Sequence, residues 1–437
     1  MRARPGRFAL RHRRIHGTQI RLCRRSELVT ATQEGSPTAA ETGAPRGLFP
    51  LLAACSALGP VSTLLLISAL PAIREEFGAS TAATQAVISV FLFTFAAGIP
   101  LAGPLSDRYG RRPLVLGGLA IFFIGSLLAY LAPTLEFVVI ARAIQAAGCA
   151  AATTVSRAVL GDIYPDWRLA RALANLTLVM MIGTSVSPYL GGLITETNGW
   201  HAPFLFLLAF SGIVGIFAWR ALPETRVSHS GALSLTAVGK ASVGVLRNRA
   251  FLGCAIDAGV IYALYLGFIT VAPYLLADML GRPATDFGIY ILFLSSGYFL
   301  GNLYVSRLRG HADLERVARF GIWLQAAAAC AAFGFVLMGL THPVWWFGPM
   351  LPLAFAQGLS LPHITATAVR LAPGYAGTAS GMIGFSQQVC AAIAVQAMGF
   401  VPTSDPLPVL GFCAALSLVS IGAMILLDRL LHPQQTP

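Results

Sequence analysis

The stretch Gly103-Pro-Leu-Ser-Asp107-Arg108-Tyr-Gly110-Arg111-Arg112 decides the fold of this sequence. It separates two long apolar runs and carries one carboxylate and three arginines. The glycine at 103 permits a second helix to approach closely, and Asp107 can cap or pair at a helix end. Because arginines beside an apolar span favour the cytoplasmic side of a membrane, the stretch predicts a cytoplasmic turn between two transmembrane helices.

The composition of the whole chain supports this interpretation. Of its 437 residues, 56% are hydrophobic and 11% are charged, whereas soluble proteins average roughly 25% charged residues. The mean hydropathy is +0.71. A compact soluble domain could not hide so much apolar surface. Disordered, collagen-like and ordinary soluble proteins are therefore excluded, and a polytopic membrane protein remains.

Apolar stretches of about 20 residues repeat from Gly47 onward, and each is long enough to cross ~30 Å of hydrocarbon. We count twelve, in two groups of six that are separated by a polar, basic segment. The expected parts are a tail (1–46), a six-helix bundle (47–221), a linker (222–250), a second six-helix bundle (251–430) and a short tail (431–437). The expected spans are 47–70, 82–103, 113–132, 136–160, 170–195, 202–221, 251–276, 285–306, 318–339, 345–367, 376–399 and 407–427.

The basic residues predict how these spans are oriented. If the N-terminus is inside, the inside connectors hold 15 arginines and lysines, and the outside connectors hold two, Arg74 and Arg282. A split of this size places both termini in the cytoplasm. The inside residues are Arg108, Arg111, Arg112, Arg168, Arg171, Arg220, Arg226, Lys240, Arg247, Arg249, Arg307, Arg309, Arg316, Arg319 and Arg370.

The net charge of +12 is concentrated in the tail 1–46, which holds ten arginines and three glutamates, a net of +7. The tail lacks the apolar core of a secretory signal. It could be an organelle transit peptide or a polybasic arm for anionic lipids. We favour a disordered tail, or translated upstream sequence with the true start near Val29. Because the other basic residues lie mostly in the connectors between the spans, we expect the chain to contact the lipid bilayer and not nucleic acid.

A second stretch, Gly301-Asn-Leu-Tyr-Val-Ser-Arg307-Leu-Arg309, follows the eighth span, 198 positions after the first. Both stretches are glycine-bearing helix ends followed by a basic turn, so the two halves of the chain look like distant repeats. Related six-span halves are typical of secondary transporters, whose substrate sites lie at the bilayer midplane between the halves.

These residues resemble the major facilitator superfamily over 47–430. The pattern Gly103-xxx-Asp107-Arg108-x-Gly110-Arg111-Arg112 matches that superfamily's loop between the second and third spans in full. The resemblance implies an all-α membrane protein of twelve helices in two six-helix bundles, with a loop that latches the outward-open state. We expect Asp162 and Arg171 to be partners of this loop. A basic loop that only sets the topology is the alternative.

Within the superfamily, the chain looks most like the twelve-span drug:proton antiporters of the bicyclomycin and chloramphenicol resistance branch. Arg142-Ala-Ile-Gln145-Ala-Ala-Gly148 resembles the fourth-span motif of that branch. Leu222-Pro223-Glu224-Thr225, after the sixth span, is typical of the group. Ala57-Leu-Gly59-Pro60-Val-Ser62-Thr63 in the first span and Gly377-Thr-Ala-Ser380 in the eleventh are also similar to it.

The fifth span resembles the antiporter motif of this branch, in the stretch Gly183-Thr-Ser-Val-Ser187-Pro188-Tyr-Leu-Gly191-Gly192. The match is partial, because the full motif has glycine where Ser187 stands. Pro188 bends the helix, and Gly191 and Gly192 permit close packing on a neighbour. The resemblance implies a joint that limits leak, and an ordinary transmembrane kink is the alternative.

The first span departs from the branch. An acid usually follows its Ser-Thr pair, but this chain continues with Leu64-Leu-Leu-Ile-Ser68 and has no acid anywhere in the span. The family's usual proton or cation site is therefore missing there. This departure leaves the coupling ion and the charge of the substrate open.

Charges at bilayer depth cost roughly 3 kcal/mol or more, so each one suggests a function. Asp257 lies well within an expected span, ~12 Å along the helix from Arg249. A buried carboxylate suits a group that binds and releases a proton, so we predict that Asp257 couples transport to protons. A carboxylate that faces a vestibule, or is paired structurally, is the alternative. For Arg142 the resemblance implies proton coupling as well, and an arginine that extends to the membrane surface is the alternative.

Uncharged polar and aromatic side chains predict the substrate cavity. We assign Thr63, Gln145, Tyr265 and Gln387 to it, because hydroxyl, amide and phenol groups among apolar neighbours suit drug-like ligands. The reference pKa of a histidine side chain is near neutral, so His363 could transfer protons. A lone histidine is more often a hydrogen-bonded structural residue, and we prefer that interpretation here.

The sequence therefore predicts a monomeric secondary active transporter in the inner (plasma) membrane, which exports small amphipathic, drug-like compounds in exchange for protons by alternating access. The seven scattered cysteines form no metal-ligand pair, and no Walker loop or catalytic cluster occurs. We thus expect no enzyme activity, metal or cofactor, and a proton gradient as the energy source. A uniporter or importer of a metabolite or nucleoside is the main alternative, and a non-transporting membrane sensor is a distant one.

Overall fold

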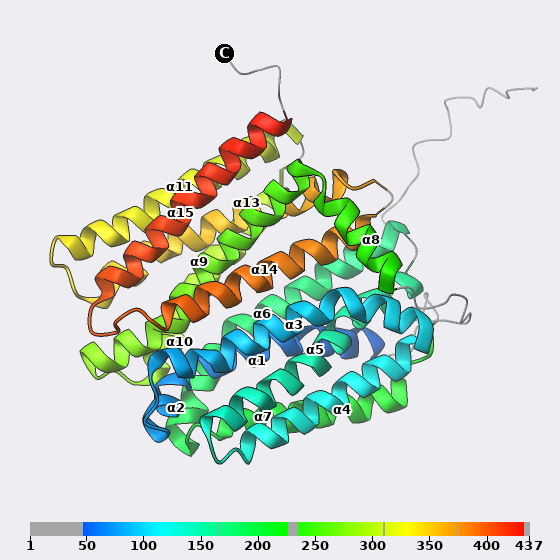
Figure 1. Cartoon of the computed structure of the whole chain (residues 1–437), viewed down its shortest axis with the longest axis horizontal. Coiled ribbons are helices and arrows are strands. Elements are labelled where there is room, and N and C mark those ends of the chain that lie inside the picture. Colours follow the sequence, from blue (N-terminus) through cyan, green and yellow to red (C-terminus); the bar gives the residue numbers. More distant parts are fainter. Residues whose placement is uncertain (1–46, 165, 226–234, 309–310, 374, 432–437) are drawn as a thin grey trace, which may run out of the picture. The chain divides into compact units, whose positions relative to one another are not determined.

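The computed structural model describes residues 47–164, 166–225, 235–308, 311–373 and 375–431. Within these residues the ordered elements are all helices (Figure 1), so the predicted all-α fold class is confirmed. The helices are α1 (Leu48–Ile67), α2 (Leu70–Glu76), α3 (Thr81–Tyr109), α4 (Arg111–Tyr130), α5 (Leu135–Ile163), α6 (Asp166–Asn198), α7 (Ala202–Ala221), α8 (Leu235–Leu246), α9 (Arg249–Leu280), α10 (Ala284–Ser306), α11 (His311–Leu337), α12 (Pro343–Phe347), α13 (Met350–Arg370), α14 (Ala376–Met398) and α15 (Pro406–Leu431).

Twelve of the helices in the described part of the chain have 20 residues or more. Eleven of these twelve are also apolar enough to cross a membrane. The exception is α13, in the region of the tenth expected span, which carries Gln357, Ser360 and His363 near its middle. These polar side chains lower its mean hydropathy. The count of twelve spans therefore stays a prediction.

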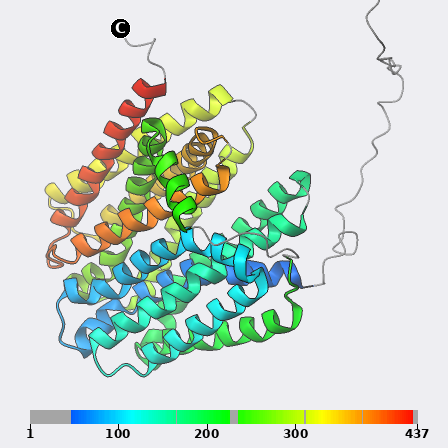
Figure 2. The ribbon, with the colours of Figure 1, turned by 45° about the vertical axis from the view of Figure 1, so that its right-hand side comes forward.

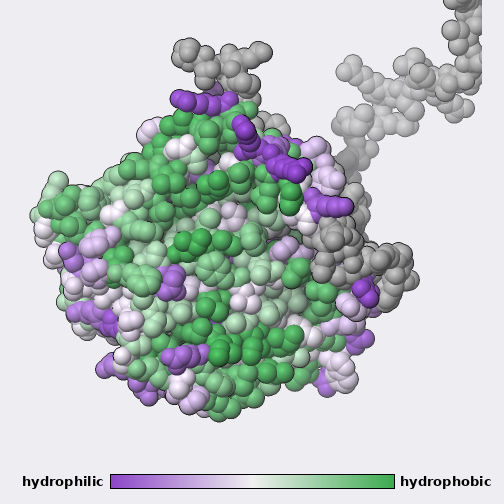
Figure 3. All heavy atoms as spheres, in the orientation of Figure 1, coloured by the Kyte–Doolittle hydropathy of each residue, from purple (hydrophilic) through white to green (hydrophobic). Residues whose placement is uncertain are grey.

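The surface of the helices is more apolar than contact with water would favour. Ile182, Phe217 and Trp219 are each at least 60% exposed. Figure 3 shows hydrophobic side chains over most of the face in view, with hydrophilic ones gathered toward its upper right and lower left. This is the surface of a protein surrounded by lipid, and the chain is a multi-pass membrane protein.

The long helices pack in two groups (Figures 1 and 2). Helices α1 and α3 to α7 form the first half, and helices α9 to α11 and α13 to α15 form the second half. Helix α3 packs on α14, and α6 packs on α10, so two helix pairs join the halves. The short helix α8 lies in the connection between the halves and is close to both α3 and α14.

The two ends of the long helices differ in charge. Arg108, Arg111 and Arg112 surround the turn from α3 to α4, and at the same end Arg249 begins α9 and Arg370 ends α13. We call this the arginine-rich end. The other end contains α2, the beginnings of α3 and α10, and the last turns of α6, α9 and α14.

The turn from α3 to α4 depends on Gly110. Its φ of 95° is a value that residues with a side chain rarely adopt. A Cβ atom at this position would also lie 2.6 Å from a carboxylate oxygen of Glu224. Both the backbone conformation and the approach of Glu224 therefore require glycine at this place in the motif.

Two neighbouring glycines of α6 bring three helices together. A Cβ atom on Gly191 would lie 2.1 Å from the carbonyl oxygen of Leu65 in α1, in the same half. A Cβ atom on Gly192 would lie 2.7 Å from the carbonyl oxygen of Ala284 in α10, in the other half. Because both obstacles are backbone atoms, which cannot move aside alone, the pair fixes α6 between α1 of its own half and α10 of the other half.

We predict that Gly191→Ala destabilises the protein by about 1–3 kcal/mol, the usual cost of forcing an extra methyl group into a packed interior. The measurement is the free energy of unfolding by sodium dodecyl sulfate in mixed micelles. Gly215→Ala in α7 is the matched control, because a Cβ atom there meets nothing within 4 Å. Equal stability of the two variants would contradict the close contact.

Candidate functional site

A central cavity of about 150 Å³ lies between the two halves. Of the residues predicted to form the substrate cavity, Thr63 and Tyr265 line it. None of its lining residues in the described chain carries a charge. They are Pro60, Thr63, Leu64, Met181, Thr184, Ser185, Tyr262, Tyr265, Leu266, Leu294, Ser295, Tyr298, Gln357 and Leu361.

The two glutamines that we expected in this cavity lie elsewhere. Gln145 is fully buried inside the first half, where its amide nitrogen donates to Ser126 Oγ at 2.7 Å and its Oε1 accepts from Arg142. Gln387 is partly buried on α14 and is not among the residues that line the cavity. Gln357 of α13 supplies an amide instead, and its Nε2 donates to the Ile261 carbonyl at 3.0 Å.

Arg142 is fully buried in the first half and ties its helices together. Its Nη1 donates to Ser62 Oγ of α1 at 2.7 Å, and its Nε donates to the Val87 carbonyl of α3 at 3.1 Å. The guanidinium also lies over the ring of Phe91, 3.9 Å from the ring centre. Nη2 has no hydrogen-bond partner in the described chain. This residue is therefore held by uncharged oxygens and an aromatic face, away from the central cavity.

Asp257 is fully buried in the second half. Its Oδ1 accepts a hydrogen bond of 2.5 Å from Ser420 Oγ of α15, whereas Oδ2 has no partner within the described residues. The structure does not bring Asp257 and Arg142 together, because α9 and α5 belong to different halves. The two predicted coupling residues are thus separate sites.

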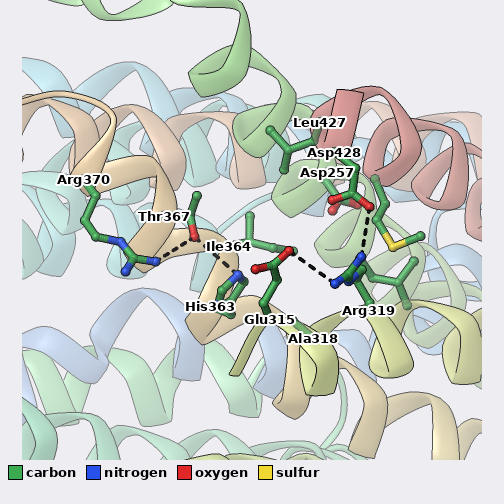
Figure 4. A pocket seen from close by; sticks show the side chains of 12 residues that line it. Asp257, Glu315, Ala318, Arg319, His363, Ile364, Thr367, Arg370, Leu427 and Asp428 are labelled. Carbon is green, nitrogen blue, oxygen red and sulfur yellow. Dashed lines mark hydrogen bonds and ion pairs between the residues drawn. The ribbon is translucent and has the colours of Figure 1, made fainter. Parts of the chain in front are cut away.

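Asp257 lines a second pocket, inside the second half, that we call the charged pocket (Figure 4). Its volume is about 260 Å³, and α9, α11, α13 and α15 form its walls. His363 lies here, with its Nε2 3.4 Å from Thr367 Oγ1. The charged or titratable residues of the pocket wall are Asp257, Glu315, Arg319, His363, Arg370 and Asp428.

One network at the arginine-rich end holds three of the predicted latch residues, Asp107, Arg111 and Asp162. Arg111 pairs with Asp107 and with Asp162, each at 3.0 Å, and also donates to Ser106 Oγ. Thr225 Oγ1 donates to Asp162 Oδ2 at 2.9 Å. Arg111 and Asp162 were expected to meet, and the structure places them in contact. These contacts join helices of the first half and the segment that follows α7.

Glu224 is a member of this network that sequence reasoning did not assign. Its two carboxylate oxygens accept from the backbone N–H groups of Arg111 and Arg112, at 2.9 and 3.1 Å. A carboxylate at the start of α4 satisfies unpaired N–H groups and complements the helix dipole. The stretch 222–225 was quoted for its resemblance alone, and its position after an apolar span was the available clue.

Gly103 does not behave as the sequence suggested. We expected it to let a second helix approach, but a Cβ atom at this position would meet no atom within 4 Å. Further along the contact between α3 and α14, a Cβ atom on Gly381 or Gly384 of α14 would lie 4.0 or 3.9 Å, respectively, from Ile99 of α3. In this state α14 thus meets α3 beside Ile99, while the space around Gly103 is open.

The two halves are bound to each other at the end of the molecule opposite to the arginine-rich end. We call this the closed end. Arg74 of α2 makes two hydrogen bonds with the carboxylate of Asp278 of α9, at 2.5 and 2.8 Å. The hydrogen bonds that Arg74 donates to the Asp278 carboxylate raise the pKa of the guanidinium, so the pair stays charged. Gln396 of α14 accepts from Ser89 Oγ at 2.6 Å and donates to the Ala82 carbonyl at 3.0 Å. From the sequence, Arg74 was expected only to be a charge outside the membrane.

The predicted antiporter kink lies at this closed end. Ser68 Oγ donates to the Pro188 carbonyl at 2.6 Å, which connects the end of α1 to α6. One turn beyond Gly192, a carboxylate oxygen of Glu196 accepts from the backbone N–H of Thr285 at 2.7 Å. Thr285 is in the first turn of α10, so a residue of the first half caps a helix of the second half. The segment from Pro188 to Glu196 is therefore part of the joint between the halves.

The chain matches a known protein family. The model of the Major Facilitator Superfamily matches residues 52–395, most of the chain. The chain belongs to the Major Facilitator Superfamily. This facilitator is accordingly a secondary transporter of small molecules.

Individual relatives are similar at low identity. The facilitator is 27% identical to an "Uncharacterized transporter" of Rickettsia bellii (strain RML369-C) over 341 residues, 75% of this chain and 83% of the relative. It is 25% identical to "Multidrug resistance protein D" of Escherichia coli (strain K12) over 364 residues, 81% of this chain and 89% of the relative. The bicyclomycin and chloramphenicol branch stays a prediction.

A solved structure supports the same fold. The crystal structure of a D-xylose-proton symporter superposes with a TM-score of 0.68 at 14% identity, over 86% of this chain and 96% of that chain. At this identity the likeness shows the fold alone. The facilitator fold of the chain, predicted from its sequence, is confirmed.

We predict that Arg74→Gln and Asp278→Asn each favour states of this facilitator in which the closed end is open. A pair worth about 1 kcal/mol changes such a population about fivefold. The double variant should match the single ones, because the pair is already broken in each. Double electron–electron resonance between spin labels on Glu76→Cys and Leu280→Cys measures the separation of the halves.

The matched control for these variants is Arg282→Gln. Arg282 pairs with Asp286 four residues away, at 3.0 Å, within the second half. Its loss should leave the label distance unchanged. A control that opens the closed end as much as Arg74→Gln would show that Arg74 acts through general charge rather than through Asp278.

Proposed function

We propose that this facilitator exports small, uncharged or amphipathic, drug-like compounds in exchange for protons, by alternating access. The central cavity carries this proposal, because its lining combines three tyrosines with apolar side chains and no charge among the described residues. Sites for drug-like ligands are mostly apolar, with a few polar groups that orient the ligand. The similarity to multidrug resistance protein D supports the same class of substrate.

The proposed orientation has the arginine-rich end in the cytoplasm of a bacterial inner membrane, with both termini inside and twelve spans. The 15:2 distribution of basic residues in the connectors supports it. In this orientation the closed end faces outward, and the open space around Gly103 faces the cytoplasm. We propose that a substrate reaches the central cavity from this side.

Asp257 is the group that we propose to take up and release the coupled proton. Its carboxylate is enclosed in the membrane, and Oδ2 has no partner in the described chain, so a bound proton is the simplest way to neutralise it. Arg142 supports coupling in another way, because it fixes α1 and α3 around a buried positive charge. Loss of Arg142 would change how the first half moves without removing the proton carrier.

A second candidate function is a uniporter or importer of a polar metabolite or nucleoside. The first span, described as α1, contains no acid, and the cavity offers hydroxyl, phenol and amide groups that suit a hydroxylated substrate. These groups belong to Thr63, Thr184, Ser185, Tyr262, Tyr265, Ser295, Tyr298 and Gln357. Uptake that a protonophore does not affect would select this function.

A growth screen tests the first function. An efflux-deficient bacterial host is grown against a panel of neutral and amphipathic compounds, with and without expression of the full chain. Export predicts higher tolerance of a subset of compounds, and this tolerance should disappear when a protonophore removes the gradient. Tolerance that survives the protonophore, or a host sensitised by expression, would contradict proton-coupled export.

We predict that Asp257→Asn abolishes substrate-driven proton movement, at least tenfold below the wild-type rate, because the amide cannot bind a proton at the pH of the assay. A pH-sensitive dye inside inverted vesicles reports the movement when an exported substrate is added. Asp286→Asn, which removes an exposed carboxylate near the closed end, is the matched control and should retain it. Full proton movement in Asp257→Asn would remove this residue from the mechanism.

A further inference from the structure

We propose that the proton of Asp257 is exchanged with water at the arginine-rich end through the charged pocket, and not through the central cavity. This inference rests on the proposed role of Asp257 in coupling. It assigns a separate proton path to the second half of the molecule. The substrate keeps the space between the halves.

The two spaces share no lining residue. Residues of both halves line the central cavity, whereas α9, α11, α13 and α15 of the second half line the charged pocket. Helix α13 divides the two spaces, since Gln357 and Leu361 line the cavity while His363 and Thr367 line the pocket. Helix α9 also separates the two spaces, because Asp257 lines the pocket and Tyr265 lines the cavity. An ion in the pocket therefore does not need to pass the substrate.

The wall of the pocket near the arginine-rich end contains a chain of ion pairs. Arg319 of α11 lies 3.4 Å from Glu315 and 3.8 Å from Asp428 of α15 (Figure 4). The side chains of Arg319, Glu315 and Asp428 are 46%, 35% and 35% exposed. Asp257 of the same pocket is fully buried. The pocket thus extends from groups that reach the surface to one carboxylate that does not.

The groups around Asp257 come from every helix that forms the pocket. Arg319 and Glu315 belong to α11, His363 and Arg370 to α13, and Asp428 to α15. Outside the wall, Cys254 lies one turn away on α9, and Cys390 of α14 packs near Gly259 of α9. With His363 neutral, three carboxylates and two guanidinium groups give the pocket a net charge of −1. One bound proton makes it neutral.

The chemical step is a simple proton transfer. A hydronium ion in the pocket, or a protonated His363, gives its proton to Oδ2 of Asp257 and leaves as water or as neutral imidazole. Oδ1 keeps its hydrogen bond from Ser420 Oγ throughout. The carboxylate becomes a carboxylic acid, so the buried group loses its negative charge. Apart from the bond between the proton and its donor, no other bond breaks. A metal ion is a poorer occupant, because the described residues contain no group of three ligating side chains.

Infrared spectroscopy on the full chain tests the path directly. The C=O stretching band of a protonated carboxyl is assigned to Asp257 by its absence in Asp257→Asn. Its rate of appearance is then followed after a rapid fall in pH. Two variants, Thr367→Cys in the charged pocket and Thr184→Cys in the central cavity, are treated with 2-sulfonatoethyl methanethiosulfonate. Both carry Cys330→Ser and Cys23→Ser, because Cys330 is exposed and Cys23 lies outside the described residues.

We expect the reagent on Thr367→Cys to slow protonation of Asp257 at least tenfold, and a reducing agent to restore the rate. The same reagent on Thr184→Cys should change the rate less than twofold. Each protein is its own reference before treatment, so recovery by the reductant shows that the fold is intact. Slowing at Thr184→Cys and not at Thr367→Cys would overturn the separate path and leave Asp257 as the coupling residue.

Two further results would overturn the inference in distinguishable ways. A wild-type spectrum without any band that Asp257→Asn removes, at any pH from about 5 to 9, means that Asp257 does not titrate. That result also rejects Asp257 as the coupling residue, but it leaves export in the growth screen untouched. A band that sodium displaces at constant pH, with choline as the control, would assign the pocket to a metal cation instead of a proton.

Discussion

Hydrocarbon supplies no hydrogen-bond partner, and this constraint governs the whole molecule. Backbone groups are satisfied within helices, so the described chain between its turns is helical. Polar side chains inside the membrane must find partners within the protein. Arg142 meets this requirement at Nε and Nη1 with a hydroxyl, an amide and a carbonyl oxygen rather than with an acid. Because lipid is as apolar as a leucine side chain, helix contacts depend on close backbone approach, which explains the tight glycine contacts of α6.

The two halves also differ in the charge that each one buries. The buried cation belongs to the first half, and the buried carboxylate belongs to the second. In the proposed movement of one half against the other, no buried charge pair among the described residues has to break. The groups that must part are at the closed end, where Arg74 and Asp278 are about a quarter exposed to solvent. Ionic contacts are exchanged for water there at modest cost.

Much of the fold could be predicted from the sequence, because membrane burial leaves a strong local pattern. The helical class follows from apolar length, and the turn at Gly110 follows from a motif whose residues act within a few positions of each other. The contact between Arg111 and Asp162 could also be anticipated, since Arg111 begins one span and Asp162 ends another on the same side. These inferences needed the order of the spans and little knowledge of their packing.

Contacts between segments that are far apart in the sequence could not be predicted. Arg74 and Asp278 are 204 positions apart, and neither stands in a motif. Gln145 was misplaced because a helical face in sequence does not reveal whether it turns to a cavity or to a neighbouring helix. Gly103 was expected to be in close contact, but the approach of another helix depends on packing between distant helices. Asp257 was found from its charge, whereas the pocket that reaches it comes from four helices.

The closed end also gives the transporter a sensitivity to its surroundings. Arg74 and Asp278, and the Glu196 carboxylate at the start of α10, lie near the aqueous boundary, and dissolved ions screen such contacts over a Debye length of about 8 Å at physiological ionic strength. Dilute media strengthen these contacts and lengthen the time spent sealed, whereas brine weakens them. In the proposed orientation, we therefore expect the salinity outside the cell to affect how readily the molecule opens outward.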